Sequence, residues 1–309
     1  MTDIITDWTD EKAQAFGKDS VSFAHSLHER PMFSDEALAA VLDRYPCESL
    51  GIYTMGEDLM DWRSWRRGES AGLSGDKLME AMKAGRLWLN LRYTNEHLPE
   101  YDALCAEMCA DQERKVPGLR TFRRDLGLLI SSPKAQVFYH LDVPMVSLWQ
   151  VRGTKTVWLY PRQEPYVPDE HIERMVMRET EGQCAFRPEW DQAAEAVELT
   201  PGKAVAWPQN VPHRVANADM VNVSLSLEYM TPAALFRANL FYANALLRRN
   251  LGVRRPKVQS RPVPAALAKL ALARAVKIAA KTRKTSKTIL PATFVVDPGQ
   301  PGGYRTLVA

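Results

Sequence analysis

From Leu126 to Met230 the sequence breaks into short β segments separated by Pro, Gly and Asn turn signals. The segments are GLLISS, AQVFYHLD, VSLWQV, KTVWLYP, AVELTPGKAVAWP, HRVANA and MVNVSLSLEYM. Short strands in such close succession are typical of antiparallel barrels and jelly rolls. This stretch therefore predicts a barrel or jelly-roll core.

Helical patterns flank the β-rich stretch on both sides. Before it, SDEALAAVLDRY, SGDKLMEAMKAG and LPEYDALCAEMCADQER predict helices, the first with Ser34 as its N-cap, while CESLGIYTM and RLWLNLRY predict strands. After it, AALFRANLFYANALLRRNLG predicts a helix that ends at Gly252, and AALAKLALARAVKIAAKTRK (265–284) predicts another. The expected fold is therefore a β core with helical additions at both ends.

The bulk composition is that of an ordinary globular protein, with 46% hydrophobic and 25% charged residues. No run approaches the roughly 18 uninterrupted apolar residues of a membrane span, and the start, MTDIITDWTDEKAQAF, is too acidic and polar for a signal peptide. The four cysteines form no CxxC pair, which suits a reducing compartment. We therefore expect a cytoplasmic protein.

A histidine and an aspartate stand two residues apart in the segment FYHLDVP. Because alternate residues of a strand face the same way, His140 and Asp142 are expected to converge on one point. A third candidate ligand is His213 in WPQNVPHRV, at the start of a later strand. Two imidazoles and one carboxylate leave coordination positions open, as in non-haem Fe(II) oxygenases. Because a lone HxD pair is also common as a structural or surface feature, its neighbourhood has to decide.

A lysine follows thirteen residues after this aspartate, at the start of KTVWLYP. Alternation places Lys155 on the same strand face as Val157 and Leu159, which predicts that it points into the barrel. An ammonium group there needs an anion, because an unpaired buried charge is costly, and a bound dicarboxylate supplies one. The alternative is a surface lysine on an edge strand.

A row of polar residues alternates with Val and Leu in MVNVSLSLEY. Asn222, Ser224, Ser226 and Glu228 share one face of this strand. Two interpretations are open: the row is exposed to solvent, or it lines a wet cavity opposite the metal.

The segments YHLD, WQVRGTK and PGKAVAWPQNVPHRV together resemble the JmjC and cupin-like Fe(II)/2-oxoglutarate oxygenases. The resemblance is strongest to the branch that contains the asparaginyl hydroxylase of hypoxia-inducible factor. It covers roughly residues 85–232 and implies a double-stranded β-helix (jelly roll or cupin) core there. The implied organisation is an N-terminal helical and mixed extension over 1–84, the catalytic core over 85–232, and a basic C-terminal helical region over 233–309.

The same resemblance implies the ligands of the site. His140, Asp142 and His213 would hold Fe(II), and Lys155 would pair with the distal carboxylate of the cosubstrate 2-oxoglutarate. The implied reaction uses O2 to hydroxylate or demethylate a protein side chain or a small molecule. No catalytic residue beyond the metal ligands is implied.

Three further residues are nominated by their positions relative to the family pattern. Ser226 falls where relatives offer a polar contact to the cosubstrate, and the strand RLWLNL nominates Trp88 and Asn90 as substrate-binding residues. Val137 and Val146 stand where some relatives have a hydroxyl and an amide, so anchoring of the cosubstrate is expected to depend mainly on the lysine.

Two other function classes compete with the oxygenase. A cupin can bind a divalent metal without 2-oxo acid chemistry, as an isomerase or a ligand-sensing module, but it has no need of an inward lysine at this register. A metal-free interaction domain has no need of the triad.

The charge of the chain is distributed unevenly. From Ala233 onward there are 15 Lys and Arg against one acid, Asp297, whereas the preceding residues hold 25 bases and 36 acids. The basic helix predicted over 265–284 can lie on an anionic membrane surface, bind nucleic acid or dock on an acidic partner. Alternatively, it packs its apolar side on the domain or on a second subunit, and the preceding helix can serve a homodimer interface.

Overall fold

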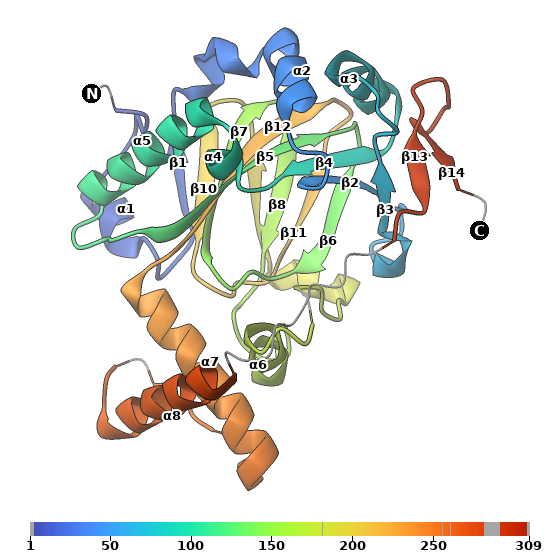
Figure 1. Cartoon of the computed structure of the whole chain (residues 1–309). Helices are drawn as coiled ribbons and strands as arrows, with labels where there is room; N and C mark the ends of the chain where they lie inside the picture. The colour runs from blue at the N-terminus through green and yellow to red at the C-terminus, as the bar shows by residue number, and fades with distance from the viewer. Residues whose placement is uncertain (1–2, 181, 255, 260, 281–290, 308–309) are drawn as a thin grey trace.

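The computed structural model describes residues 3–180, 182–254, 256–259, 261–280 and 291–307. Two sheets packed face to face form its centre (Figure 1). In spatial order, the larger sheet consists of β1 (Val21–Ala24), β10 (Lys203–Trp207), β7 (Met145–Arg152), β12 (Asn222–Met230), β5 (Phe122–Ser131), β4 (Leu87–Leu91), β2 (Leu50–Thr54), β3 (Arg66–Glu69), β13 (Phe294–Val296) and β14 (Tyr304–Thr306). The smaller sheet consists of β6 (Gln136–His140), β11 (His213–Asn217), β8 (Lys155–Leu159) and β9 (Glu195–Leu199).

The space between the two sheets is filled from both sides by apolar side chains. The larger sheet contributes from β7 and β10, and the smaller from β8, β9 and β11. The buried members of this interior cluster are Val146, Leu148, Val157, Leu159, Leu199, Val205, Trp207, Val211 and Val215. The expected fold class, a mainly β jelly-roll core with helical additions, is confirmed.

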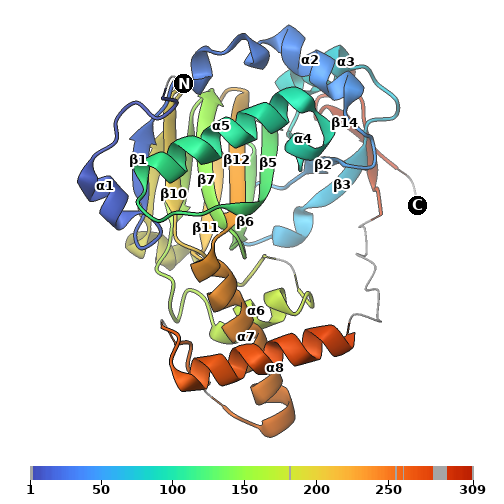
Figure 2. The ribbon, with the colours of Figure 1, turned by 60° about the vertical axis from the view of Figure 1, so that its left-hand side comes forward.

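The outer face of the larger sheet carries the main hydrophobic core. Helix α5 (Pro99–Lys115) lies across this face, over β7, β12 and β5 (Figure 2). The alternation of β5 and β12 supplies the buried side chains beneath it, which are Leu126, Leu128, Ile130, Val223, Leu225 and Leu227. The residues between them in sequence face the other sheet, so the strand pattern fixes which residues can reach the interior.

The predicted helix starts and stops agree with the structure. Helices α2 (Asp35–Arg44) and α3 (Gly75–Ala84) begin after Ser34 and Ser74, whose hydroxyl oxygens accept hydrogen bonds from backbone N–H groups of the first turn. Helix α7 (Pro232–Leu251) ends at Gly252, which has a left-handed φ of 65°. The remaining helices are α1 (Asp10–Ala15), α4 (Thr94–His97), α6 (Asp169–Val176) and α8 (Pro264–Ala280), with short 3-10 turns at Leu27–Glu29, Pro31–Phe33, Trp62–Ser64 and Pro188–Ala193.

The C-terminal region is helical only in part. Helices α7 and α8 form a crossed pair that projects from the sandwich (Figure 1), and positions 281–284 of the predicted second helix lie outside the described residues. The expectation of a helical region is wrong for 294–306, where β13 and β14 form a hairpin. Strand β13 pairs in parallel with β3, opposite Gly68, whose missing side chain leaves room for the Phe294 ring. Strands from 1–84 and from 233–309 join strands of 85–232 in the ten-stranded sheet. The sheet therefore continues across both predicted domain boundaries, 84/85 and 232/233, and these boundaries stay predictions.

Within the described part of the basic C-terminal region (233–309), the cations that form ion pairs with acids are Arg248 and Arg249. Arg248 pairs with Glu170 and Glu173, and Arg249 with Glu179, in or just after α6. Further along, none of the described cations up to Ala280 forms an ion pair with a described acid; these are Arg254, Lys257, Arg261, Lys269, Arg274 and Lys277.

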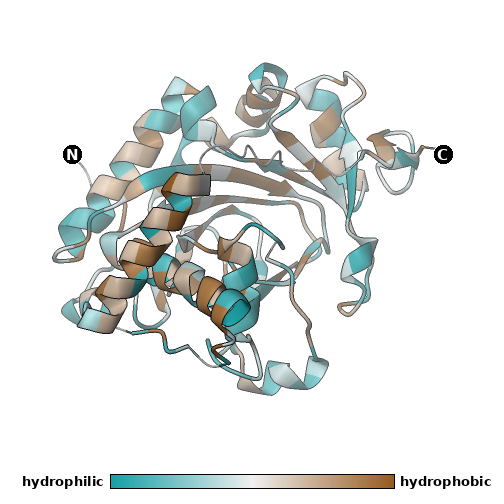
Figure 3. Cartoon of the chain, turned by 60° about the horizontal axis from the view of Figure 1, so that its bottom comes forward, coloured by the Kyte–Doolittle hydropathy of each residue, from teal (hydrophilic) through white to brown (hydrophobic). Residues whose placement is uncertain are grey.

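Large apolar side chains are exposed on the same projecting pair of helices. Hydrophobic turns run along both helices in the foreground of Figure 3, and Leu251, Leu267 and Ile278 are each more than half exposed. Within the described part of the chain, no helix combines the length and the apolar character needed to cross a membrane. Whether a membrane, a nucleic acid, an acidic partner or a second copy of the chain covers this pair stays a prediction.

Candidate metal centre

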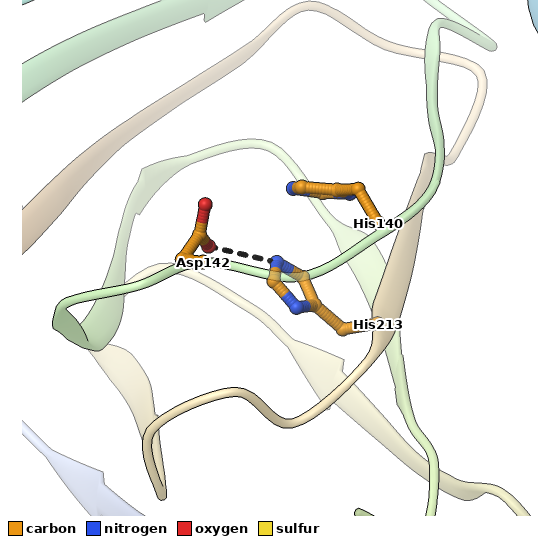
Figure 4. Close-up of side chains that lie close together, drawn as sticks. All are labelled: His140, Asp142 and His213. Atoms are coloured by element: carbon orange, nitrogen blue, oxygen red, sulfur yellow. Dashed lines mark ion pairs between the residues drawn. The ribbon is translucent and has the colours of Figure 1, made fainter. Parts of the chain in front are cut away.

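His140, Asp142 and His213 converge at one end of the smaller sheet (Figure 4). His140 ends β6 and His213 begins β11; the two are cross-strand partners whose ring centroids lie 4.1 Å apart. The carboxylate Oδ2 of Asp142 is 3.5 Å from Nε2 of His213. One ligand atom from each of the three lies within 4.8 Å of the others. The predicted convergence of the three side chains is confirmed.

The physical reason for this convergence differs from simple strand alternation. Asp142 lies two residues beyond the end of β6, so it is not a strand residue. In β6, two residues separate Val137 from His140, whereas one residue separates their partners Val215 and His213 in β11. The extra residue is a β-bulge, which shifts the alternation of β6 and turns His140 toward the same interior as Val137.

Backbone carbonyls orient both imidazoles. Nδ1 of His140 lies 2.7 Å from the carbonyl oxygen of Phe138, and Nδ1 of His213 lies 3.0 Å from that of Val211. Because a carbonyl can only accept, each Nδ1 donates, which leaves Nε2 as the nitrogen that each ring can offer to a metal ion. Burial, and then repulsion from His140, lowers the pKa of His213 to about 4, so His213 is neutral at pH 7. His213 is thus in the form that binds a metal ion.

Two amide side chains of the loop WPQNVP donate hydrogen bonds to the backbone at and just after Asp142. Asn210 has a left-handed φ of 62° and donates from Nδ2 to the carbonyl oxygen of Asp142 at 2.8 Å. Gln209 donates from Nε2 to the carbonyl oxygen of Val143 at 2.6 Å. These two amides were not singled out from the sequence; the signal for Asn210 is that asparagine tolerates the left-handed region better than most residues.

Lys155 points into the interior between the sheets, together with Val157 and Leu159. It is 4% exposed, and no hydrogen bond or ion pair joins its ammonium group to any other residue in the described ranges. Burial lowers the pKa of Lys155 to about 7. Because β8 is paired on both sides, the alternative of an edge-strand surface lysine is wrong.

The distance from the lysine to the triad follows from strand register. His213 pairs with Leu159, and Lys155 lies four residues further along β8. At the usual strand rise this separates the two backbone positions by about 13 Å. The two side chains enter the same interior from opposite ends of the ladder.

The polar row of β12 faces this interior as well. Their cross-strand partners on β7 are Gln150 for Ser224, Leu148 for Ser226 and Val146 for Glu228. Leu148 and Val146 belong to the interior cluster. The interpretation of a solvent-exposed row is therefore wrong, and the row faces the interior between the two sheets; whether it lines a wet cavity stays a prediction. Ser224 is fully buried and donates to Oε1 of Gln150, whereas Ser226 and Glu228 are partly accessible.

Asn90 and Trp88 lie on the same inner face, on β4. Asn90 pairs with Leu129, which packs against the interior cluster. A Cβ built on Gly127 would lie 3.6 Å from Cβ of Ser226 and 3.9 Å from Oδ1 of Asn90, so these two side chains flank one glycine. The Trp88 ring instead packs in an aromatic group: its centroid lies 5.1 Å from the ring centroid of Trp65 and 5.5 Å from that of Tyr53. The contact of Ser226 with the cosubstrate and the contacts of Trp88 and Asn90 with the substrate stay predictions.

An ion-pair cluster continues the inner face beyond β4. Arg92 donates to Oδ2 of Asp125 at 2.5 Å and to Oε2 of Glu228 at 3.0 Å. Burial, together with the neighbouring carboxylates of Asp142 and Asp125, raises the pKa of Glu228 to about 8, against the opposing effect of Arg92. No sequence motif indicates this cluster, because its three members come from β5, β12 and the residue after β4 and meet through strand register.

Comparison of the sequence with family models gives no match, and no curated protein matches it significantly. Among solved structures, the chain is similar to YcfD of Escherichia coli. One X-ray structure of YcfD has a TM-score of 0.52 at 19% identity, covering 90% of this chain and 69% of YcfD. A second, described as a ribosomal oxygenase, has a TM-score of 0.50 at 19% identity, covering 90% and 68%.

A third structure of YcfD was solved in complex with cobalt and 2-oxoglutarate. It has a TM-score of 0.48 at 18% identity, covering 85% of this chain and 64% of YcfD. At 19% identity the first two comparisons support a shared fold, and the asparaginyl-hydroxylase branch stays a prediction.

Proposed function

We propose that this protein is an Fe(II)- and 2-oxoglutarate-dependent oxygenase that hydroxylates or demethylates a protein side chain or a small molecule. The observation that carries the proposal is the triad of His140, Asp142 and His213 with the unpaired, inward Lys155 about 13 Å along the same ladder. The similarity in fold to a protein described as a ribosomal oxygenase supports the same class.

The donor set fits a divalent metal with open coordination positions. Two imidazole nitrogens and one carboxylate oxygen within 4.8 Å of one another form one side of a coordination sphere. The carbonyls of Phe138 and Val211 hold the two rings in orientation, and Asn210 holds the backbone of the aspartate. When bound, iron and 2-oxoglutarate together activate O2 for attack on a C–H bond.

The role proposed for Lys155 follows from its missing partner. A buried ammonium group without an anion is costly, and the cost is recovered when a carboxylate binds opposite it. A 2-oxo acid that reached the metal with one end could give Lys155 its other carboxylate. Ser226 and Asn90, which flank Gly127 on the same face, are proposed to orient that ligand by hydrogen bonds.

A metal-binding cupin without 2-oxo acid chemistry is the alternative, and Lys155 separates the two proposals. The test is an anaerobic titration of Fe(II)-loaded protein with 2-oxoglutarate, following the visible charge-transfer band of the chelate. We expect the band in the wild type and in the matched variant Lys203→Ala, whose lysine is exposed on β10. We expect Lys155→Ala to need a much higher ligand concentration.

Two results would count against the oxygenase. No band in the wild type, with iron content verified by metal analysis, would favour the metal-binding cupin. A band of equal intensity and midpoint in Lys155→Ala would remove the role proposed for the lysine. Thermal unfolding of each variant establishes that a lost band is not a lost fold.

A further inference from the structure

The residue between two of the candidate metal ligands is an apolar anchor. Leu141 separates His140 from Asp142 and is 1% exposed. Its side chain packs outside the interior between the two sheets, in a separate cluster. The buried members of that cluster are Leu141, Val167, Ile172 and Phe241, and Met175, Val176, Cys184 and Val258 pack against them. The backbone that carries both ligands is therefore held from the side opposite the triad.

The cover over Leu141 comes from helices outside the sandwich. Ile172 lies on α6 and Phe241 on α7, and the two helices are in contact (Figure 1). The segment after α6 approaches the same backbone, because the Leu141 amide donates to the carbonyl oxygen of Gly182 at 3.1 Å. A Cβ built on Gly182 would lie 2.4 Å from the Leu141 carbonyl oxygen, so this close approach requires a glycine.

Helix α7 reaches the backbone around the aspartate a second time, at its first turn. Gln209 donates from Nε2 to the carbonyl oxygens of Val143, at 2.6 Å, and Ala234, at 3.1 Å. Ala234 and Phe241 are seven residues apart, so the two points of support are roughly 10 Å apart along the helix. Because Asp142 lies beyond the end of β6, such contacts hold its backbone where a strand ladder would otherwise do so.

Ion pairs hold α7 against α6. Arg248 donates from Nε and Nη2 to the two carboxylate oxygens of Glu173, at 2.9 and 3.2 Å, and its Nη1 lies 2.7 Å from Glu170. The Glu173 side chain is 4% exposed, and a buried carboxylate that loses its cation is costly. These pairs therefore fix how the two helices meet, and with it where Phe241 lies against Leu141.

We propose that Phe241 is a positioning residue for the metal centre that acts through Leu141, and that Arg248 keeps it in place. This inference rests on the metal triad of the proposed function and does not depend on 2-oxoglutarate. Loss of the Phe241 ring frees the anchor, so the ligands on either side of it, His140 and Asp142, lose their fixed spacing. Helix α7 is thereby a support of the metal centre as well as a projecting element.

The test compares Co(II) binding to Phe241→Ala, Phe241→Leu and Phe294→Ala by absorbance titration. Phe294 is as fully buried as Phe241 but packs opposite Gly68 in the outer core, so it matches the loss of a ring away from the triad. We expect Phe241→Ala to bind Co(II) about 10- to 100-fold more weakly than wild type and to alter the visible Co(II) spectrum at saturation. Phe241→Leu keeps an apolar contact and should recover most of the affinity, whereas Phe294→Ala should stay within about twofold of wild type.

A second series tests the contact between the helices. Arg248→Gln leaves the buried Glu173 without the cation that it pairs with and is expected to weaken Co(II) binding several-fold. The double variant Arg248→Gln with Glu173→Gln removes both charges and should recover most of the loss. Arg30→Gln breaks a bidentate pair with Glu107 on α5 and should leave the affinity unchanged. Urea unfolding of every variant shows whether it is folded under the conditions of the titration.

Four outcomes would overturn the positioning role. They are wild-type affinity and spectrum in Phe241→Ala, an equal loss in Phe294→Ala, no recovery in Phe241→Leu, and wild-type protein that binds no Co(II). Unchanged affinity in Arg248→Gln would remove the part given to the ion pairs.

The charge-transfer titration separates this inference from the oxygenase. No band with 2-oxoglutarate, together with a Co(II) affinity that depends on Phe241, would reject the oxygenase and leave the positioning role standing. A normal band beside an unchanged Phe241→Ala would do the reverse.

Discussion

Replacing Lys155 by methionine is expected to stabilise the metal-free protein while it weakens binding of 2-oxoglutarate. The lysine is 4% exposed and has no partner in the described part of the chain, and burial lowers its pKa from 10.5 to about 7. In the unfolded chain the same amine is solvated and keeps its ordinary pKa. The folded state therefore binds fewer protons than the unfolded state between these two values, and its stability rises with pH across this window.

The size of the effect follows from the two pKa values. At 1.36 kcal/mol per pKa unit, the lysine costs the folded state about 4 kcal/mol at pH 7 and about 1 kcal/mol at pH 10. These figures are ceilings, because relaxation and water penetration lower the cost of a buried charge in real proteins. We expect Lys155→Met to be about 1 to 4 kcal/mol more stable than wild type at pH 7, with the gap shrinking as the pH approaches 10.5.

Urea unfolding of metal-free wild type, Lys155→Met and Lys203→Met at pH 7 and pH 10 measures these differences. The exposed Lys203 controls for loss of a surface charge and is expected to change stability by less than about 0.5 kcal/mol. Equal or lower stability of Lys155→Met at pH 7, or a gap that does not change with pH, would refute the assignment of an unpaired buried amine. With metal already bound to both proteins, addition of 2-oxoglutarate should then stabilise wild type more than Lys155→Met.

Other substitutions test the metal ligands, the cosubstrate contact and the core. Asp142→Asn is expected to lower affinity for Co(II) at least about 100-fold in an absorbance titration, since it removes one of three ligands; a loss under threefold would contradict the triad. Ser226→Ala should weaken 2-oxoglutarate binding about 2- to 10-fold, which corresponds to the loss of one hydrogen bond, and leave metal affinity unchanged. Unchanged affinity for 2-oxoglutarate would place the serine outside the site. Leu225→Ala, in the core under α5, should cost about 2 to 5 kcal/mol in urea unfolding, whereas Leu267→Ala, 52% exposed, should cost under about 0.5 kcal/mol; similar costs would contradict the burial described.

The chemistry of the metal centre could be predicted because it depends on residue type and order. His140, Asp142 and His213 are ligand types at intervals that a strand and a later strand can bring together, and Lys155 alternates with apolar residues that must face the core. The same alternation could not decide between cavity and solvent for Ser226, because a polar row satisfies both. Only the pairing of β12 with β7 resolves that choice.

The features that escaped prediction depend on contacts between distant segments. Arg92 and Glu228 are 136 residues apart, and neither stands in a motif. The parallel pairing of β13 with β3 joins residues such as Phe294 and Gly68, and no local pattern announces a partner so far away. Both depend on strand register, which the whole fold sets.

The bulge in β6 makes the candidate metal centre depend on an irregularity of the backbone as well as on the ligands themselves. If β6 were regularly pleated at its present length, Tyr139 would pair with His213 and His140 would turn to the outer face. Loss of a single codon for Phe138 or Tyr139 would instead leave one residue between Val137 and the histidine, as one separates Val215 from His213 in β11. A β6 shortened in this way needs no bulge, and its histidine is expected to keep the inward face.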